Sequence, residues 1–457
     1  MEREFKYTLF IGLLLALAGC GENIAIGSGG SAGSGGSAGV AGSPGTGGSP
    51  GNGGAAGSPA LDPLSATPRY AVLSSDFSSS SIAMLDADFF SIDESWLNSG
   101  TTYPGLVATL SGDVVLPNRQ AGDGTFAVVD RLFTDVVTRF FVPSGNLHGQ
   151  ARTHGDIGDS GFSSNPQDFI SVGADSAWVP RYETNLSPTA APENQGNDLI
   201  EVDPSDMSRT GARVDLSPLN TTATVMGDNG PVEVDVFARP SRGVLVGSRI
   251  IVGLDRISAA FNAAGSGMVA IVDLEDESLD DLALPGLKSC GRLVPVPGSP
   301  NKVLAACVGF AQPFGDEPQV RASSGIVLLD VGETEVSIDE VWRVADHAGD
   351  PIAVNAVIAI DSRRVLGVAS GDFGANPDRL FLIDLETGAQ ELVHEATGSF
   401  VIGEAAYDPD SEMLYVPDAA ENAVLEFAAD GGGFVEVGST TIAPGIGLPP
   451  TKVYLLD

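Results

Sequence analysis

Two histidines and an aspartate lie close together in one polar stretch of the chain. His148, His154 and Asp156 all fall within residues 148–156. Imidazole nitrogens and carboxylates are ligands for divalent metals. A second stretch, residues 371–378, is rich in Asp, Asn and Gly and contains Asp372, which suits Ca²⁺. These residues are candidate metal ligands, with Ca²⁺ as the candidate cofactor. Exposed polar loop residues are the alternative, because the spacing of the two histidines is not a recognised ligand pattern.

Catalytic motifs are absent from the sequence. There is no nucleophile elbow, P-loop, dinucleotide fingerprint or zincin motif, and the serines and histidines suggest no triad. We therefore expect a binding or scaffolding protein rather than an enzyme. The alternative is a divalent-cation-dependent, lactonase-like hydrolase of the cell envelope, with acidic residues around a central channel.

Cys290 and Cys307 are the only cysteines outside the N-terminal segment. They flank a predicted hairpin whose turn is 298–301, at near-equal offsets from that turn. An exported protein can keep a disulfide. A cross-strand disulfide and two separately buried thiols are both open interpretations.

The N-terminus carries Arg3 and Lys6, followed by an apolar run over 9–18 that is too short to span a bilayer. The run ends in Leu17-Ala18-Gly19-Cys20, which resembles the lipobox of bacterial lipoproteins. That resemblance implies a signal peptide over 1–19, lipidation of Cys20 and anchoring to a lipid bilayer. Because Gly21 rather than Asp follows, it implies outer-membrane delivery, facing either the periplasm or the exterior.

Residues 20–60 consist almost entirely of Gly, Ser, Ala and Pro. Such a segment cannot bury enough apolar surface to offset its backbone entropy, so we predict a disordered linker. The folded domain is then 61–457. The net charge of -37 argues against binding of nucleic acid or anionic lipid through a basic patch.

A repeat organises the predicted domain. Apolar strands end in an acidic residue and a polar turn, with a degenerate last copy, at 81–86, 125–130, 199–203, 269–273, 326–330, 380–384 and 424–428. A hairpin precedes most copies, at 107–117, 169–180, 234–246, 293–306, 357–368 and 405–418. Four strands per unit and about seven units predict an all-β, seven-bladed β-propeller. The strand-ending aspartates are interpreted as turn residues.

Ring closure follows from the two ends of the predicted domain. The first unit begins at Arg69–Leu73 with a second-position strand, and no innermost strand precedes it. Residues 452–457 have the pattern of an innermost strand with no partner after it. We therefore predict that the C-terminal strand pairs into blade 1 and closes the ring.

The stretch Tyr415-Val416-Pro417-Asp418 resembles the strand signature of YVTN-type seven-bladed propellers, as do 178–181, 115–118 and the turn at 383–388. The resemblance covers the whole folded domain. The lipobox with its Gly/Ser/Pro linker resembles lipoproteins of myxobacteria-like organisms. Lactonase-like enzymes and surface-layer proteins are among the relatives that this resemblance implies.

Long predicted loops gather on one face of the ring, at 143–167, 181–197, 248–267 and 309–325. Long loops are usually functional, although neutral insertion is the alternative. We expect a binding rim for an unknown protein, glycan or small molecule, on a monomer. Its candidate residues are Arg181, Tyr182, Arg256, Phe310 and Phe373.

Overall fold

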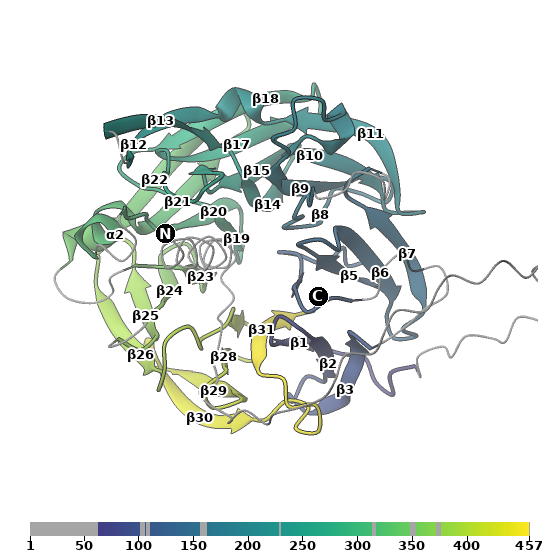
Figure 1. Cartoon of the computed structure of the whole chain (residues 1–457). Helices are drawn as coiled ribbons and strands as arrows, with labels where there is room; N and C mark the ends of the chain where they lie inside the picture. The colour runs from purple at the N-terminus through teal and green to yellow at the C-terminus, as the bar shows by residue number, and fades with distance from the viewer. Residues whose placement is uncertain are drawn as a thin grey trace, which may run out of the picture.

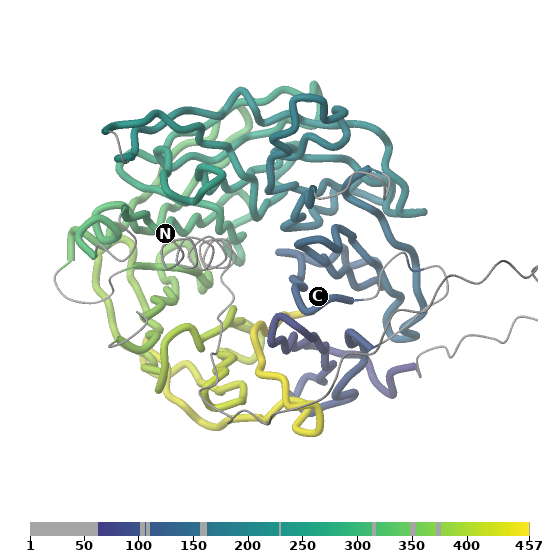
Figure 2. The backbone as a smooth tube through the Cα atoms, viewed as in Figure 1, coloured from purple at the N-terminus to yellow at the C-terminus, as the bar shows by residue number. Residues whose placement is uncertain are grey.

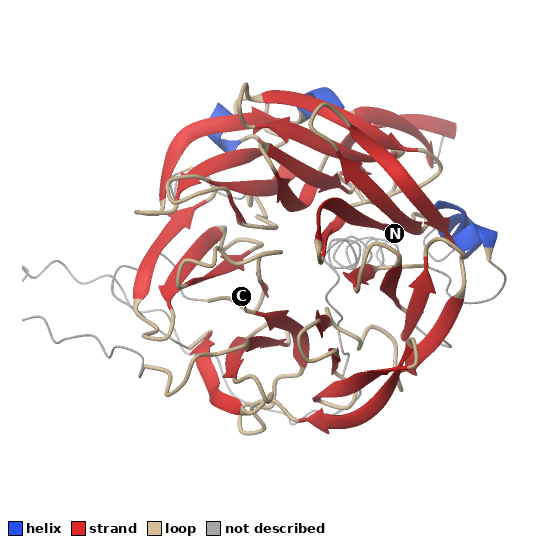
Figure 3. Ribbon diagram, turned by 180° about the vertical axis from the view of Figure 1, so that it is seen from behind, coloured by secondary structure: helices blue, strands red, loops and turns tan. Residues whose placement is uncertain are grey.

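The computed structural model describes residues 63–100, 106, 110–155, 162–227, 230–312, 317–347, 353–371 and 376–456. Within these ranges the chain is nearly all β, with the short helix α2 (Glu317–Ser323) at the periphery (Figure 3). The described part also has the 3-10 turns η1 (Pro192–Asn194), η2 (Ser217–Leu219) and η3 (Val344–Asp346). None of the described helices is long and apolar enough to cross a membrane.

Seven four-stranded antiparallel sheets are arranged radially around a common centre, as in a β-propeller (Figure 1). We number them along the chain and give their strands from the centre outward. Sheet 1 has β31 (Pro450–Leu455), β1 (Tyr70–Ser75), β2 (Ser80–Leu85) and β3 (Ser91–Asn98). Sheet 2 has β4 (Val114–Val115), β5 (Thr125–Asp130), β6 (Val136–Phe141) and β7 (Leu147–Arg152). Sheet 3 has β8 (Ile170–Ser171), β9 (Ala177–Thr184), β10 (Gly196–Asp203) and β11 (Ser208–Asp215).

Four further sheets continue the arrangement. Sheet 4 has β14 (Pro240–Val246), β15 (Arg249–Leu254), β17 (Gly267–Asp273) and β18 (Ser278–Leu284). Sheet 5 has β19 (Arg292–Val296), β20 (Ser299–Cys307), β21 (Gly325–Val331) and β22 (Val336–Arg343). Sheet 6 has β23 (Ala356–Ala359), β24 (Arg364–Ala369), β25 (Arg379–Asp384) and β26 (Gln390–Glu395). Sheet 7 has β27 (Ala406–Asp408), β28 (Met413–Asp418), β29 (Ala423–Asp430) and β30 (Gly433–Thr440).

The first and last sheets are joined through the C-terminal strand. Strand β31 pairs with β1, with Tyr70 opposite Leu455 and Val72 opposite Val453. In Figure 2 the yellow C-terminal segment runs beside the purple start of the described chain. The predicted pairing of this strand with the first unit is therefore present in the structure.

Alternating side chains in each sheet build the core, because successive residues of a strand point to opposite faces. On β1, Ala71 and Leu73 pack in a cluster with sheet 2. Tyr70 and Val72 pack in a cluster with sheet 7, together with residues such as Tyr415. Seven such clusters each join two neighbouring sheets. Each buried Val, Leu or Phe contributes about 1.5–3 kcal/mol, so the stacking of sheets stabilises the arrangement.

Four of the aspartates that end the predicted strands, Asp86, Asp203, Asp273 and Asp384, act as turn residues. Asp130 instead accepts the amide of Ser111, and Asp330 the side chain of Asn301. Oδ1 of Asp203 accepts the amide of Ser205, and Oδ1 of Asp384 accepts the amide of Thr387. Asp86 bonds the amides of residues 88 and 90 in the same manner. The predicted turn role of these four aspartates is confirmed.

Sheets 2 and 4 differ from the strand order that we predicted. Residues 234–237 belong to β13 (Gly230–Phe237), which forms a separate sheet with β12 (Thr221–Gly227) and β16 (Ile257–Ser258). The innermost strand of sheet 4 is β14, and the predicted loop 248–267 contains β15. The turn of this hairpin, at Gly247 with φ of 59°, is tight, so no long polar segment marks the hairpin in the sequence.

In sheet 2, the strand 125–130 is second from the centre rather than third, since β6 and β7 both lie outside it. The predicted loop 143–167 therefore contains a strand, β7. Residues 107–109, part of the predicted innermost strand, lie outside the described residues.

Candidate functional site

Four charged side chains from four different sheets meet at the centre of the ring, and we call them the central cluster. They are Arg242 on β14, Arg292 at the start of β19, Glu404 shortly before β27 and Lys452 on β31. They are far apart in the sequence, so only the radial arrangement of the inner strands brings them together. None of the four was among the residues predicted from the sequence.

Glu404 is the carboxylate on which the three cations converge. Its Oε2 lies 2.6 Å from Nζ of Lys452, and its Oε1 accepts a 3.1 Å hydrogen bond from Nη1 of Arg292. Nη2 of Arg242 lies 3.5 Å from Oε1. Burial raises the pKa of Glu404, but the charges of Lys452, Arg242 and Arg292 outweigh burial and hold the pKa far below its ordinary value. Glu404 is therefore ionised at neutral pH and is a poor proton acceptor.

The pKa of Lys452 is set by opposing effects of burial and neighbouring charges. Burial lowers its pKa, the charge of Glu404 opposes this, and the charge of Arg242 adds to the lowering. The net direction is downward from the ordinary value of a lysine. A buried lysine with a lowered pKa exchanges its proton more readily than a surface lysine does.

The segment 116–120, which we call the crossing segment, runs from sheet 2 towards the opposite side of the centre. The carbonyl of Leu116 accepts hydrogen bonds from Nη1 of Arg242 at 2.8 Å and from Nζ of Lys452 at 3.3 Å. The amide of Gln120 donates to the hydroxyl of Tyr454 at 2.6 Å. The crossing segment therefore holds Arg242 and Lys452 in place, although it belongs to neither of their sheets.

Asn118 and Asp168 complete this framework. Nδ2 of Asn118 donates to the carbonyls of Gly243 at 3.1 Å and of Leu293 at 2.7 Å. The buried carboxylate of Asp168 accepts the amides of Asn118 and Gly243, at 3.0 and 2.9 Å. These bonds tie sheets 2, 4 and 5 together at the centre.

A cavity of about 750 Å³ opens over the central cluster, lined chiefly by the inner strands of sheets 1, 4, 5, 6 and 7. Its charged lining residues are Arg119, Arg242, Arg292, Lys302, Glu404 and Lys452. A second cavity, of about 520 Å³, lies towards sheets 2 and 3 and shares Asn118 and Arg119 with the first. The inner strands of sheets 2 and 3 have only two residues each, and the segments next to them line the second cavity.

The side chain of Arg292 is buried, although not all of its donors form hydrogen bonds. Its side chain is only 8% exposed, and Nη1 is bonded to Glu404. Nε and Nη2 have no hydrogen-bond partner among the described residues. Guanidinium donors that are buried without acceptors are costly, and the nearby charge of Asp255 offsets part of that cost.

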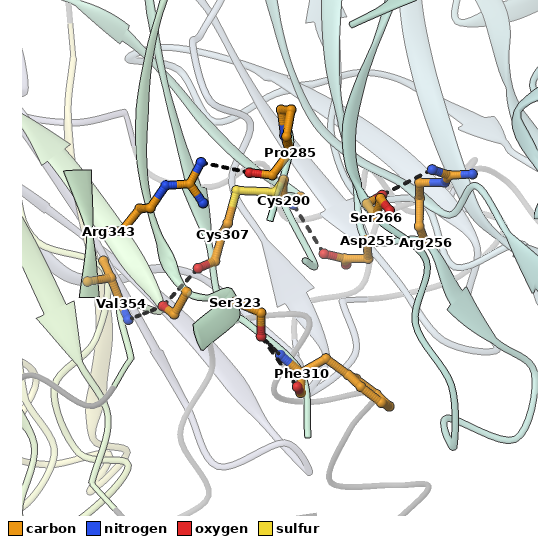
Figure 4. The surroundings of a disulfide bond; sticks show 12 residues. Asp255, Arg256, Ser266, Pro285, Cys290, Cys307, Phe310, Ser323, Arg343 and Val354 are labelled. Carbon is orange, nitrogen blue, oxygen red and sulfur yellow. Dashed lines mark hydrogen bonds between the residues drawn. A yellow bond between two sulfur atoms is a disulfide. The ribbon is translucent and has the colours of Figure 1, made fainter. Parts of the chain in front are cut away.

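A disulfide anchors the strand that carries Arg292. Cys290 and Cys307 are bonded, so the structure adopts the disulfide alternative (Figure 4). Beside it, the amide of Gly291 donates to Asp255 at 3.2 Å. Burial raises the pKa of Asp255 to about 6, although the charge of Arg292 opposes the rise. A Cβ at Gly267 would lie 2.7 Å from Sγ of Cys290, so this close approach requires glycine.

Four of the candidate residues of the binding rim are buried. Arg181 is fully buried and binds both carboxylate oxygens of Asp198, at 2.7 and 2.6 Å. Tyr182, Arg256 and Phe310 are also buried. Arg181 and Tyr182 belong to strand β9 rather than to a loop, whereas Arg256 and Phe310 follow the ends of β15 and β20. Phe373 lies outside the described residues.

The two histidines predicted as metal ligands have different neighbours. His148 lies on β7, and its Nε2 is 2.7 Å from the carbonyl of Pro204. Nε2 of His154 lies 3.8 Å from Oδ2 of Asp135. In the part of the chain that the structure describes, no three His, Cys, Asp or Glu residues gather in a way that could hold a metal. Asp156, Asp372 and the lipidation candidate Cys20 lie outside that part.

Comparisons with known proteins show similarity at the level of the fold. No protein-family model matches the sequence, and no curated protein does. A periplasmic gluconolactonase from Pseudomonas aeruginosa is similar in structure, with a TM-score of 0.50 and 14% identity over 86% of this chain and 99% of the other.

Two further solved structures match with lower scores. One is a provisionally assigned 6-phosphogluconolactonase from Bacteroides fragilis, with a TM-score of 0.46 and 10% identity over 86% of this chain and 99% of the other. The second is the Cps50 (Swd1) β-propeller domain of Myceliophteria thermophila, with a TM-score of 0.40 and 12% identity over 70% and 84%. The gluconolactonase supports the β-propeller fold of this chain.

Proposed function

We propose that this chain is a cell-envelope protein whose propeller acts on a small molecule in its central cavity, in the manner of a lactonase. The observation that carries the proposal is the central cluster at the base of a cavity of about 750 Å³. Small-molecule sites are concave, measure about 300–1,000 Å³ and contain a few convergent polar groups. The cavity therefore suits a ligand of sugar size.

Hydrolysis of a lactone creates negative charge on the carbonyl oxygen as water attacks the ring. Fixed cationic donors in a partly enclosed site stabilise such charge. Arg242, Arg292 and Lys452 supply donors of this kind, and Glu404 and the crossing segment hold them in place. The proposal is argued from these cationic side chains and invokes no divalent cation.

A scaffolding role is the second candidate, and it is supported less well. It is inferred from the predicted anchor, linker and long loops and from the absence of catalytic motifs, but the candidate rim residues Arg181, Tyr182, Arg256 and Phe310 are buried. The similarity in fold to a periplasmic gluconolactonase agrees better with the small-molecule role.

The proposed ring has seven blades and closes through β31. Seven four-stranded sheets, the pairing of β1 with β31 and the apolar cluster between sheets 7 and 1 support it. The YVTN-type and myxobacterial resemblances remain sequence-based proposals.

Anchoring through Cys20 is likewise proposed from the lipobox-like sequence. Metabolic labelling with a palmitate analogue tests it. Label should enter the full-length protein and be lost in Cys20→Ser. Equal labelling of both proteins would contradict the anchor.

The lactonase proposal is tested by lactone hydrolysis. The full chain is mixed with D-glucono-1,5-lactone, and acid release is followed with a pH indicator above the spontaneous rate. We expect acceleration by the wild type, a large loss in Lys452→Met and little change in Lys302→Met. Lys302 lines the same cavity, but Asp339 and Asp330 already pair it, at 2.8 and 3.4 Å. No acceleration by the wild type would overturn the proposal.

A further inference from the structure

We propose that this chain forms a dimer with a second copy of itself, in which strand β12 of each copy pairs antiparallel with β12 of the other. The residues of β12 line neither of the two cavities, so the inference does not depend on the proposed function. The dimer differs from the monomer expected from the sequence.

The hairpin of β12 and β13 is an addition to the ring of sheets. The seven four-stranded sheets are complete without it, and it lies at the periphery of the molecule (Figure 1). Its base is attached where Val236 and Phe237 of β13 pair with β16. Every residue of the two strands outside that base is exposed or half-buried. Because a two-stranded hairpin is only marginally stable in water, this hairpin would gain stability from further strands.

Strand β12 is an edge strand without the usual protection. It pairs with β13 on one side, and no described strand pairs with its other side. Edge strands of natural proteins usually carry charged side chains that prevent pairing with another chain. The outermost strand of each four-stranded sheet has at least one charged residue, such as Glu436 on β30, whereas β12 has none. The unpaired edge of β12 is therefore open to another strand.

The sequence of β12 is self-complementary when the strand pairs antiparallel with its copy. A two-fold axis at Thr224 pairs all seven residues and places Thr224 opposite its own copy. Thr222 then lies opposite Met226 of the second copy, and Ala223 lies opposite Val225. No charged side chains meet across the pair, and Thr–Thr pairs on a sheet are favourable. These matches favour a second copy as the occupant of the edge.

Pairing would also extend the apolar face of the hairpin. Ala223 and Val225 lie opposite Val234 and Val232 of β13, so these four side chains share one face. Val232 is 48% exposed in the single copy. In the dimer the two apolar faces become one face of a four-stranded sheet, and three or more strands with an apolar face are stable where a lone hairpin is not.

The net charge of -37 on each copy opposes association, but the acidic residues beside β12 do not meet. Glu233 and Asp235 lie on β13. In the dimer the two β13 strands are three strand spacings apart, about 14 Å. Charges at that distance are largely screened at physiological salt. Because screening also reduces the repulsion between whole copies, dimerisation should strengthen as salt is raised.

Sedimentation velocity on the full chain with Cys20→Ser tests the dimer. This substitution removes acyl chains and the thiol of Cys20 as other causes of association. Seven paired residues from each copy make a small interface, so we expect a weak dimer that forms between about 1 and 100 µM. Thr224→Lys places like charges opposite each other and should weaken dimerisation about tenfold or more. Thr210→Lys is the matched control, since Thr210 is an exposed threonine on the outermost strand β11.

Cysteine cross-linking tests the pairing itself. In the Cys20→Ser chain, Thr224→Cys should form an intermolecular disulfide on mild oxidation, because the Cα atoms of the two residues 224 would lie about 5 Å apart. Thr222→Cys is the control on the same face of the same strand. Its two copies would be four residues apart along the sheet, about 14 Å, which is beyond the reach of a disulfide.

Thermal unfolding of each variant shows that it is folded. A wild-type chain that is monomeric at every concentration would overturn the inference. So would equal dimerisation of a folded Thr224→Lys protein and the wild type, or cross-linking that does not distinguish Thr224→Cys from Thr222→Cys.

Discussion

Replacing Glu404 with glutamine removes the charge on which three buried cations depend. The side chain keeps its size, but its amide nitrogen would lie near Nζ of Lys452 or Nη1 of Arg292, where an oxygen now accepts. Leaving buried charges without their partner costs about 3–5 kcal/mol. For a domain of this size, we expect Tm to fall by about 4–6 °C, measured by differential scanning calorimetry.

The pH dependence of this effect follows from the lowered pKa of Glu404. A carboxyl group with a lowered folded-state pKa stabilises the fold above its unfolded pKa and loses that contribution as pH falls through the folded pKa. The deficit of Glu404→Gln should therefore persist from about pH 8 to about pH 5.

Glu386→Gln is the matched control, since Glu386 is 66% exposed and pairs with Arg363 at the surface. Exposed pairs contribute about 0–1 kcal/mol, so this control should unfold almost as the wild type does. If Glu404→Gln were as stable as the wild type, our account of the central cluster would be refuted.

Three further perturbations test the fold around the site. Deletion of residues 452–457 removes most of β31, including buried Val453 and Tyr454, which contribute about 3–6 kcal/mol together, comparable with the stability of many domains. Circular dichroism should show loss of cooperative unfolding, and a native melt would contradict ring closure. Replacing Cys290 and Cys307 by serine opens a loop with a sequence separation of 17, and should cost about 3 kcal/mol in urea unfolding. An unchanged midpoint would mean that this disulfide does not constrain the unfolded chain. Burial raises the pKa of Asp130 to about 7, so its carboxyl destabilises the fold progressively as pH rises from about 4 to about 7. Asp130→Asn should therefore gain stability relative to the wild type at about pH 8 but not at about pH 4, and an equal difference at both would refute this.

The repeat made much of the fold predictable from the sequence. Apolar runs that end at residues such as Asp203 and Asp384 recur with regular turns, and these aspartates bond backbone amides as expected. In sheet 4 the prediction failed at a tight hairpin turn, and in sheet 2 it placed the strand 125–130 one position too far out. Residues 250–254 are an apolar run, yet the turn at Gly247 is too short to be noticed beside longer polar segments.

The central cluster could not be predicted from spacing, because its members come from four sheets and share no local motif. A weaker signal was present. Arg242, Arg292 and Lys452 are isolated cations near the start of otherwise apolar strands, in a chain with few cations. An ionised side chain rarely lies within an apolar strand unless it is paired, so each could have been marked as a candidate partner of a buried acid.

The most direct test of our account is a crystal structure of the full chain grown with saturating D-gluconate or D-glucose 6-phosphate. We predict that the ligand lies in the central cavity, beside the side chains of the central cluster. A ligand bound only on the outer surface, beside a central cavity that holds nothing but water, would contradict the central claim.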